Sequence, residues 1–280
     1  MTVMQPTAAS ETFPNGTGPA QPRALPMTRA RRVALALGVP ACLALTAWGA
    51  FAIVGEIGQG HFPVSAAIPV SGGKVTAHFG GGSVVLQQGA AGQAKLTGTA
   101  HYSLVRPTFT AQRVGGGVSF GYNCDLPVGN CGLDATVTVP AGTATAISTD
   151  GGNATVTGTT GDVTMSSGGG DVTADHAAGD LTLTTDGGNI NGTALTAARV
   201  TAGTGGGDVR IEFATVPDNI HITSDGGNIT IIVPRGTTQY NVNASSAGGN
   251  VTDSLSINTF SPHTITATTG GGDITLREAP

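Results

Sequence analysis

The sequence contains few aromatic and few charged residues. Phe, Trp and Tyr account for 4% of its 280 residues, and Asp, Glu, Lys and Arg together account for 10%. A globular core built around large aromatic side chains is therefore excluded. Glycine is abundant, at 45 residues, but it follows no strict three-residue period, which argues against a collagen-like chain.

The apolar residues that are present are mainly Val, Ile, Leu and Ala, and they are interspersed with Thr. Such a mixture favours β-strands. Apolar and polar residues alternate in short runs, as in Val163-Thr164-Met165 and Val209-Arg210-Ile211. A period of two indicates strands that bury one face, and these glycine-rich runs are too short for helices. The sequence therefore predicts an all-β fold.

Charge is distributed unevenly along the chain. Residues 1–32 hold four arginines and one glutamate, whereas residues 58–280 hold eight Lys or Arg and fifteen Asp or Glu. Because an acidic body is not typical of a nucleic-acid-binding domain, no nucleic-acid partner is expected. A basic tail ahead of an acidic body instead suggests a preferred orientation in a membrane.

A long apolar run follows the basic tail. Residues 33–54 read VALALGVPACLALTAWGAFAIV, and about 20 such residues span a bilayer as a helix. We predict a disordered cytoplasmic tail over 1–32, a transmembrane helix over 33–55 and a linker over 56–63. The arginines place the N-terminus in the cytoplasm and the C-terminal domain outside the cell, in a single-pass cell-membrane protein. A cleaved signal peptide ending near residues 50–52 is the alternative.

Two of the three cysteines, Cys124 and Cys131, lie close together in the stretch YNCDLPVGNC. A location outside the cytoplasm favours a disulfide between them, and a pair of free thiols is the alternative. A zinc site would need two more soft ligands nearby, and the surrounding sequence offers none. We therefore predict a disulfide that closes a short loop, and we predict no metal ligand and no cofactor.

A motif of the form [ST]-[DGA]-G-G-[ND], followed by an apolar residue, occurs seven times. A unit with about two short strands suits one coil of a parallel β-solenoid, in which coils stacked about 4.8 Å apart form a narrow core. We predict about seven coils of 18–23 residues over 149–280, and a less regular β cap of the solenoid over 64–148. The glycine pairs are expected to provide positive φ angles at the corners. The copies begin at Thr149, Ser167, Thr185, Thr204, Ser224, Ser246 and Thr269.

Each corner carries an Asp or Asn residue whose place in the motif shifts from copy to copy. Like charges in neighbouring coils repel by roughly 1 kcal/mol in water. Moving the Asp by three places in alternate coils separates the carboxylates, and Asn can bridge between coils. We therefore interpret the corner residues as structural and not catalytic. They are Asp150, Asn153, Asp171, Asp186, Asn189, Asp208, Asp225, Asn228, Asn250 and Asp273.

These repeats support a family resemblance. The GG[ND]-apolar copies, the cysteine loop and the strand ATVTVP at 135–140 resemble the bacterial "putative adhesin" β-solenoid domain family, whose members often follow one membrane helix in actinobacterial proteins. The resemblance covers roughly residues 64–280. It implies a β-solenoid domain of unknown function and brings no catalytic motif, and likeness of fold does not itself supply a function.

Sequence motifs of common enzymes are missing. The chain has no G-x-S-x-G, H-E-x-x-H or Walker pattern, and its six histidines share no motif spacing. We therefore expect a non-catalytic protein with an adhesion-like or envelope-structural role, whose partners are the membrane and a cell-envelope glycan or protein. A calcium-binding surface solenoid is an alternative, although one carboxylate per corner is few for the about 6–8 oxygens that this ion takes. A further alternative is a β-helix enzyme that acts on polysaccharides.

Overall fold

The computed structural model describes residues 59–103, 106–124 and 131–280, which belong to one compact unit, Ala52–Pro280. The predicted cytoplasmic tail (1–32) and transmembrane helix (33–55) lie outside the described residues. Every regular element of the described ranges is a β-strand, which confirms the all-β prediction, and no helix suited to crossing a membrane is found in these ranges.

The strands are short and numerous. In chain order they are β1 (Gln59–Pro69), β2 (Val75–Phe79), β3 (Val84–Gln88), β4 (Gln93–Ser103), β5 (Thr108–Val114), β6 (Gly117–Asn123), β7 (Cys131–Val139), β8 (Thr145–Thr149), β9 (Ala154–Thr157), β10 (Val163–Ser167), β11 (Val172–Asp175), β12 (Leu181–Thr185), β13 (Ile190–Leu195), β14 (Arg199–Thr204), β15 (Val209–Phe213), β16 (Asn219–Ser224), β17 (Ile229–Val233), β18 (Asn241–Ser246), β19 (Val251–Asp253), β20 (Thr264–Thr269) and β21 (Ile274–Glu278).

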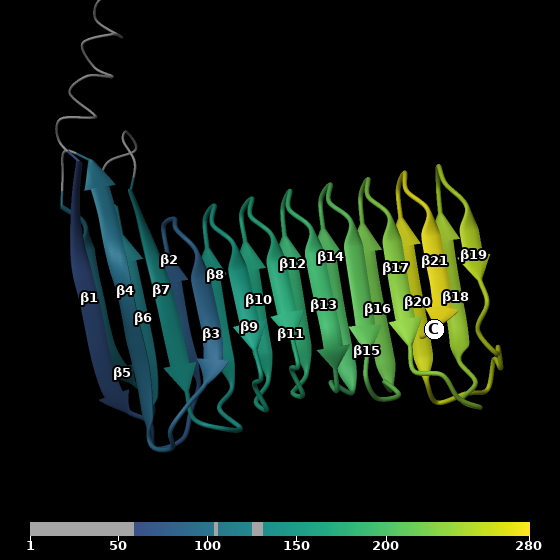
Figure 1. Ribbon diagram of the computed structural model, residues 1–280, viewed down its shortest axis with the longest axis horizontal. Coiled ribbons are helices and arrows are strands. Elements are labelled where there is room, and N and C mark those ends of the chain that lie inside the picture. Colours follow the sequence, from purple (N-terminus) through teal and green to yellow (C-terminus); the bar gives the residue numbers. More distant parts are fainter. Residues whose placement is uncertain (1–58, 104–105, 125–130) are drawn as a thin grey trace, which may run out of the picture. The chain divides into compact units, whose positions relative to one another are not determined.

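These strands form two facing sheets, as Figure 1 shows. Sheet A has eleven strands in the order β1-β4-β7-β3-β9-β11-β13-β15-β17-β21-β19, and sheet B has ten in the order β18-β20-β16-β14-β12-β10-β8-β2-β6-β5. One coil consists of a strand of sheet B, a corner and a strand of sheet A. Neighbouring coils pair in parallel, for example β10 with β12 and β11 with β13. The predicted stack of parallel coils is therefore confirmed.

The core is a thin layer of aliphatic side chains between the sheets. Alternate residues of each strand point inward, and the parallel register aligns them from coil to coil. In sheet B one such line contains Val163, Leu181, Val200, Ile220 and Ile265, all of which are nearly inaccessible to solvent. Burying each of these side chains contributes about 1.5–3 kcal/mol. No coil can bury its inner face alone, so stability depends on the stack.

The order of the coils differs from chain order at both ends. Near the N-terminus, coil β2–β3 lies between coils β6–β7 and β8–β9, and near the C-terminus, coil β20–β21 lies between β16–β17 and β18–β19. The predicted cap over 64–148 therefore contains two further coils of the same solenoid. The predicted boundary at residue 149 is wrong, because the motif marks the turn inside a coil and not the start of one, so that Thr149 is the last residue of β8.

The N-terminal end is closed by antiparallel strands. Strands β1 and β4 extend sheet A, and β5 extends sheet B. The predicted linker over 56–63 is wrong from residue 59 onward, since β1 begins at Gln59 and pairs with β4 along its whole length. Pro63 lies within this strand, and an edge strand tolerates proline because one row of its N–H groups has no partner strand.

The corner glycines do not have the positive φ angles that we expected. The glycines with positive φ lie mainly in turns outside the seven motif copies, for example Gly72, Gly92 and Gly142. In the motif the second glycine is needed for a different reason. A Cβ atom at Gly170, Gly188 or Gly207 would meet the main chain of the corresponding glycine in the adjacent coil. Close stacking of the corners therefore requires glycine there.

Candidate functional site

The last residue of each corner motif belongs to one continuous row, which we call the Asn/Asp row. The main-chain N–H of each member after Asn153 donates to the side-chain Oδ1 of the preceding member in the adjacent coil, at 2.7–2.9 Å. In addition, the Nδ2 groups of Asn189 and Asn228 donate to Asp171 and Asp208 at 3.3 and 3.1 Å. In spatial order the row reads Asn153, Asp171, Asn189, Asp208, Asn228, Asp273 and Asn250.

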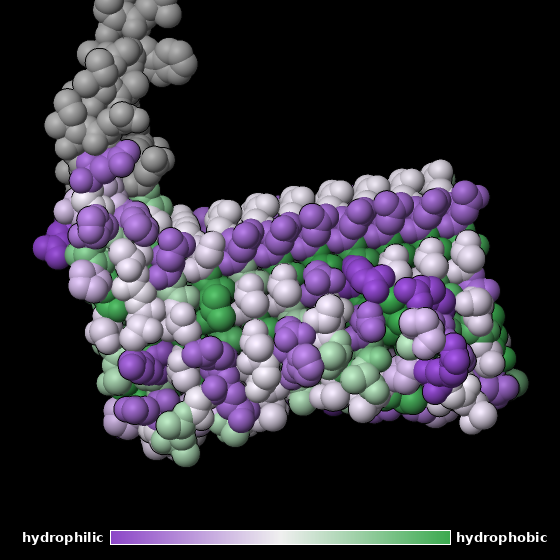
Figure 2. Space-filling model, in the orientation of Figure 1, coloured by the Kyte–Doolittle hydropathy of each residue, from purple (hydrophilic) through white to green (hydrophobic). Residues whose placement is uncertain are grey.

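Asn and Asp alternate strictly along this row. The alternation is broken in chain order, where Asn250 follows Asn228, and it is restored by the exchanged positions of coils β18–β19 and β20–β21. The remaining acids, Asp150, Asp186 and Asp225, lie three places earlier in three of the four coils that carry Asn. Carboxylates at the same corner position are therefore always two coils apart. Figure 2 shows this edge of the unit as a continuous hydrophilic line.

A second row of hydroxyl groups, which the sequence reading missed, lies beneath the Asn/Asp row. The Ser or Thr that opens each motif donates to the carbonyl of the second glycine in the neighbouring coil, and it accepts the N–H of the second glycine in its own coil. For Thr185 these distances are 2.8 Å to Gly170 and 3.1 Å to Gly188. The signal was the presence of a hydroxyl residue in all seven copies. The row is Thr149, Ser167, Thr185, Thr204, Ser224, Thr269 and Ser246.

The outer face of sheet A carries polar side chains beside the Asn/Asp row. Asn191, Arg210, Thr230 and Thr275 occupy equivalent outward positions on β13, β15, β17 and β21. Together with members of the Asn/Asp row they line a shallow groove of about 600 Å³. The guanidinium of Arg210 contacts Glu212 at 3.1 Å and is about half exposed. This groove, which we call the sheet A groove, presents donors, acceptors and one cation to the solvent.

The disulfide links Cys124 to Cys131, the pair that the sequence predicts, with their Cα atoms 6.3 Å apart. It occupies the corner of coil β6–β7, where the other coils carry the glycine motif. The neighbouring Tyr122 is fully buried, and burial raises its pKa to about 12. Its neutral phenol donates a hydrogen bond to the main-chain carbonyl of His101 at 3.3 Å. Strand β6 is therefore tied to strand β4.

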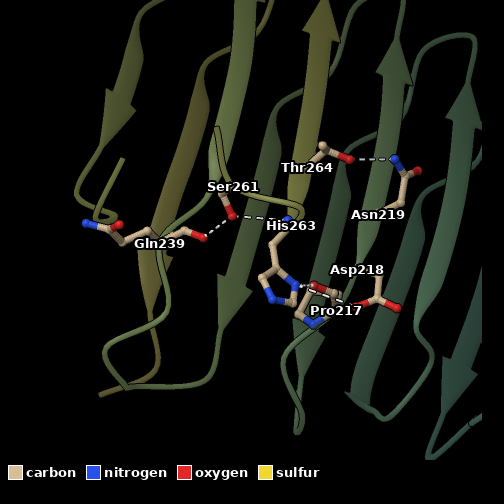
Figure 3. A network of polar contacts seen from close by, with 7 residues as sticks. All are labelled: Pro217, Asp218, Asn219, Gln239, Ser261, His263 and Thr264. Carbon is tan, nitrogen blue, oxygen red and sulfur yellow. Dashed lines mark hydrogen bonds and ion pairs between the residues drawn. The ribbon is translucent and has the colours of Figure 1, made fainter. Parts of the chain in front are cut away.

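A polar network fixes coil β20–β21 at the corner opposite to the motif (Figure 3). His263 contacts the carbonyl of Pro217 through Nδ1 at 2.9 Å, so this nitrogen carries the proton. The main-chain N–H of Thr264 donates to the carbonyl of Asp218, and Asn219 Nδ2 donates to Thr264 Oγ1 at 2.6 Å. These contacts join the start of β20 to the connection between β15 and β16, and this histidine has a structural role.

The described residues contain no group of three or more His, Cys, Asp or Glu side chains placed to hold a metal ion. The ten corner residues are brought together along one edge. In the Asn/Asp row, Oδ1 of each member up to Asp273 holds the adjacent coil. The histidines are scattered, except that His61 and His101 lie opposite each other on β1 and β4.

Comparison with known proteins places the chain in a family. The family model described as Toastrack DUF4097 matches residues 108–277. Among solved structures, similar chains include a "putative cell adhesion protein" from Clostridium sporogenes (14% identity, TM-score 0.37, covering 78% of this chain and 100% of that one). A "putative adhesin" from Bacteroides fragilis has 16% identity and TM-score 0.43, and a "putative lipid binding protein" from Parabacteroides distasonis has 13% and 0.42. Both alignments cover 78% of this chain and 97% of theirs.

A search of curated protein sequences found no match. The match to the family model spans more than half of the chain and includes all seven copies of the corner motif. The chain therefore belongs to the Toastrack DUF4097 family.

Proposed function

We propose that the protein is a membrane-anchored solenoid with a non-catalytic, adhesion-like or envelope-structural role outside the cytoplasm. The observation that carries this proposal is the use of the corner motif. Its hydroxyls, glycines and Asn/Asp side chains hold one coil to the next, so the repeated acids act as scaffold. The surface left for recognition is the outer face of the sheets.

The sheet A groove is the part of that surface best suited to a polar ligand. Its side chains offer amide, hydroxyl and guanidinium groups within a few coils of each other. Such groups form hydrogen bonds with glycan hydroxyls or with a polar protein surface, while the rigid sheet beneath limits the entropy lost on binding. We propose a cell-envelope glycan or protein as the partner.

Two features of the sequence support the location. The apolar run over 33–54 follows four arginines, which favours a helix with a cytoplasmic N-terminus. The disulfide between Cys124 and Cys131 suits an oxidising compartment.

The proposal is tested by a pull-down with the full chain in detergent micelles against cell-wall fractions and a panel of envelope glycans. We expect retention on at least one fraction, with the loss of that retention in Arg210→Ala. Arg235→Ala is the matched control, because Arg235 is also exposed but does not line the groove. Equal retention of both variants would show that the ligand binds a surface other than the sheet A groove. No retention on any fraction would contradict the binding role.

The calcium alternative is separated from this proposal by one measurement. If calcium held the coils together, addition of EDTA would lower the unfolding temperature by many degrees. We expect no shift, since the main-chain N–H of the next coil already occupies Oδ1 of Asp171, Asp208 and Asp273.

A further inference from the structure

Two histidines face each other at the N-terminal end of sheet A. His61 on β1 and His101 on β4 are direct partners in the antiparallel pairing, and both are exposed. They line one pocket of about 350 Å³ together with Gln59, Gly60, Tyr102 and Ser103. Residues directly opposite on one face of a sheet have Cβ atoms about 4.5–5.5 Å apart, which lets two imidazoles reach a shared ion.

The next strand supplies a carboxylate that orients one of these rings. Nε2 of His101 lies 3.5 Å from Oδ2 of Asp134 on β7, while Oδ1 of Asp134 accepts the main-chain N–H of Ser83 at 2.9 Å. Because a carboxylate oxygen only accepts, this arrangement suits a His101 that binds an ion through Nδ1 and turns its Nε2–H toward Asp134. A histidine that binds a metal commonly donates its other N–H to a carboxylate in this way.

The main chain that carries the pair is held firmly. Strand β4 lies between β1 and β7, and the carbonyl of His101 accepts the hydrogen bond from the buried Tyr122 hydroxyl. The His101 side chain is nevertheless 55% exposed, so an ion can approach it from solvent. The pair is therefore both positioned and accessible.

We propose that His61 and His101 form a binding site for a divalent transition-metal ion, with Asp134 as a positioning residue. Imidazole ligands suit Cu²⁺, Ni²⁺ and Zn²⁺, and Cu²⁺ binds tightest in the general order of affinities. Water completes the coordination, since only two protein nitrogens are supplied. The site is independent of the sheet A groove and of the proposed partner.

The test is calorimetric titration of the full chain, in detergent micelles, with Cu²⁺, Ni²⁺ and Zn²⁺ separately. We expect one saturable site whose affinity falls at least tenfold in His61→Asn and in His101→Ala. Asp134→Asn should weaken binding about tenfold, the usual scale for an orienting carboxylate, and Asp134→Glu should restore part of that loss.

His221→Ala is the matched control, because His221 is an exposed strand residue of sheet B that faces no second histidine. It should bind as the unmodified chain does, and unfolding temperatures without metal should be equal for all variants. The proposal is overturned if no ion gives saturable binding, or if His61→Asn and His101→Ala both keep full affinity. Full affinity in Asp134→Asn would overturn the positioning role of the carboxylate.

Discussion

The middle of the solenoid and its two ends use the same coil but stack it in different orders. From β8 to β17 each coil lies on the one that precedes it in the chain. At either end, the coil that is farther from the middle in sequence lies against the middle, and the coil that is adjacent to the middle in sequence lies one place further out. Repetition of the motif alone therefore does not determine the order, and other residues must select it.

At the C-terminal end, the outer coil β18–β19 carries a charged residue at an inward position. Asp253 is in register with Leu276, whose side chain is completely buried. If β18–β19 took the inner place, the Asp253 carboxylate would lie in the apolar layer, where an unpaired charge is very costly. In the outer place it accepts the N–H of Leu255 at 2.9 Å. A charge at an inward position also protects the free sheet edge from pairing with another chain.

At the N-terminal end, the outer coil β6–β7 also differs from the middle coils in sequence. Its corner contains the disulfide between Cys124 and Cys131 in place of the glycine motif. The glycine corners stack so closely that a single Cβ atom would clash. Coil β6–β7 therefore lacks the glycine corner through which the middle coils stack. Each end thus has an outer coil whose sequence departs from that of the middle coils.

The largest expected effect distinguishes the two glycines of one corner in the middle. A Cβ atom at Gly188 would meet the Gly170 carbonyl, whereas a Cβ at Gly187 would have nothing within 4 Å. We expect Gly188→Ala to lower the free energy of unfolding by about 3 kcal/mol or more, and Gly187→Ala to change it by less than about 0.5 kcal/mol. Urea titration followed by circular dichroism measures both values.

The same change at the end should be milder. Gly249 is the equivalent of Gly188 in coil β18–β19, and its Cβ would meet Gly272 of the one coil on which it lies. Because this coil has a neighbour on one side only, it can move outward. An equal loss in Gly249→Ala and Gly188→Ala would show that the end is as tightly held as the middle.

The next effect concerns the hydroxyl row. Removing the Thr185 hydroxyl leaves the Gly170 carbonyl and the Gly188 N–H without their buried partner. We expect Thr185→Ala to lower the free energy of unfolding by about 2 kcal/mol, and Thr185→Ser to recover most of it. Ser246→Ala should cost less, since Ser246 is only partly buried and water can replace its hydroxyl. Similar losses at both positions would contradict this difference.

A smaller effect is expected from breaking the alternation of the Asn/Asp row. Asn189→Asp would place a carboxylate between Asp171 and Asp208, whereas Asn250→Asp would have Asp273 as its only neighbour in the row. Each new neighbour costs roughly 1 kcal/mol in water. We therefore expect about twice the destabilisation in Asn189→Asp, and the same for Asn228→Asp. The loss of stability should be smaller in high salt. An unchanged melting temperature at low salt would show that repulsion between carboxylates is not the reason for the alternation.

The sequence was sufficient to predict the regular middle but not the ends. The alternation in runs such as Val163-Thr164-Met165 and the recurring GG[ND] corners predict parallel strands one coil apart, because both signals are local. The pairing of β2 with β8 joins residues about 70 positions apart, and no periodic pattern marks it. The opposition of His61 and His101 depends on the antiparallel register of β1 and β4, and neither strand carries a copy of the repeat that would mark it. The Asn/Asp row was thus predictable because the repeat itself creates it, whereas the histidine pair was not.

The smallest expected effect is on the stability of the middle coils at low pH. Asp175 accepts a hydrogen bond from Thr193 of the adjacent coil at 2.7 Å and contacts His176 at 2.9 Å. The Thr193 hydroxyl, and then His176, lower the pKa of Asp175 below its ordinary value. The ionised form is therefore favoured in the folded state. The resulting stabilisation is fully present above the ordinary carboxyl pKa and is lost as the pH falls through the lowered pKa.

Thr193→Val removes the largest cause of that shift, so the pKa of Asp175 should move back up toward its ordinary value. The free energy of unfolding, measured by urea titration from neutral pH downward, should then begin to fall at a slightly higher pH than in the unmodified chain. Thr201→Val is the matched control, as an exposed threonine of β14. If the pH at which the free energy of unfolding begins to fall rises equally in both variants, the bond between β11 and β13 has no part in holding the middle coils together at low pH.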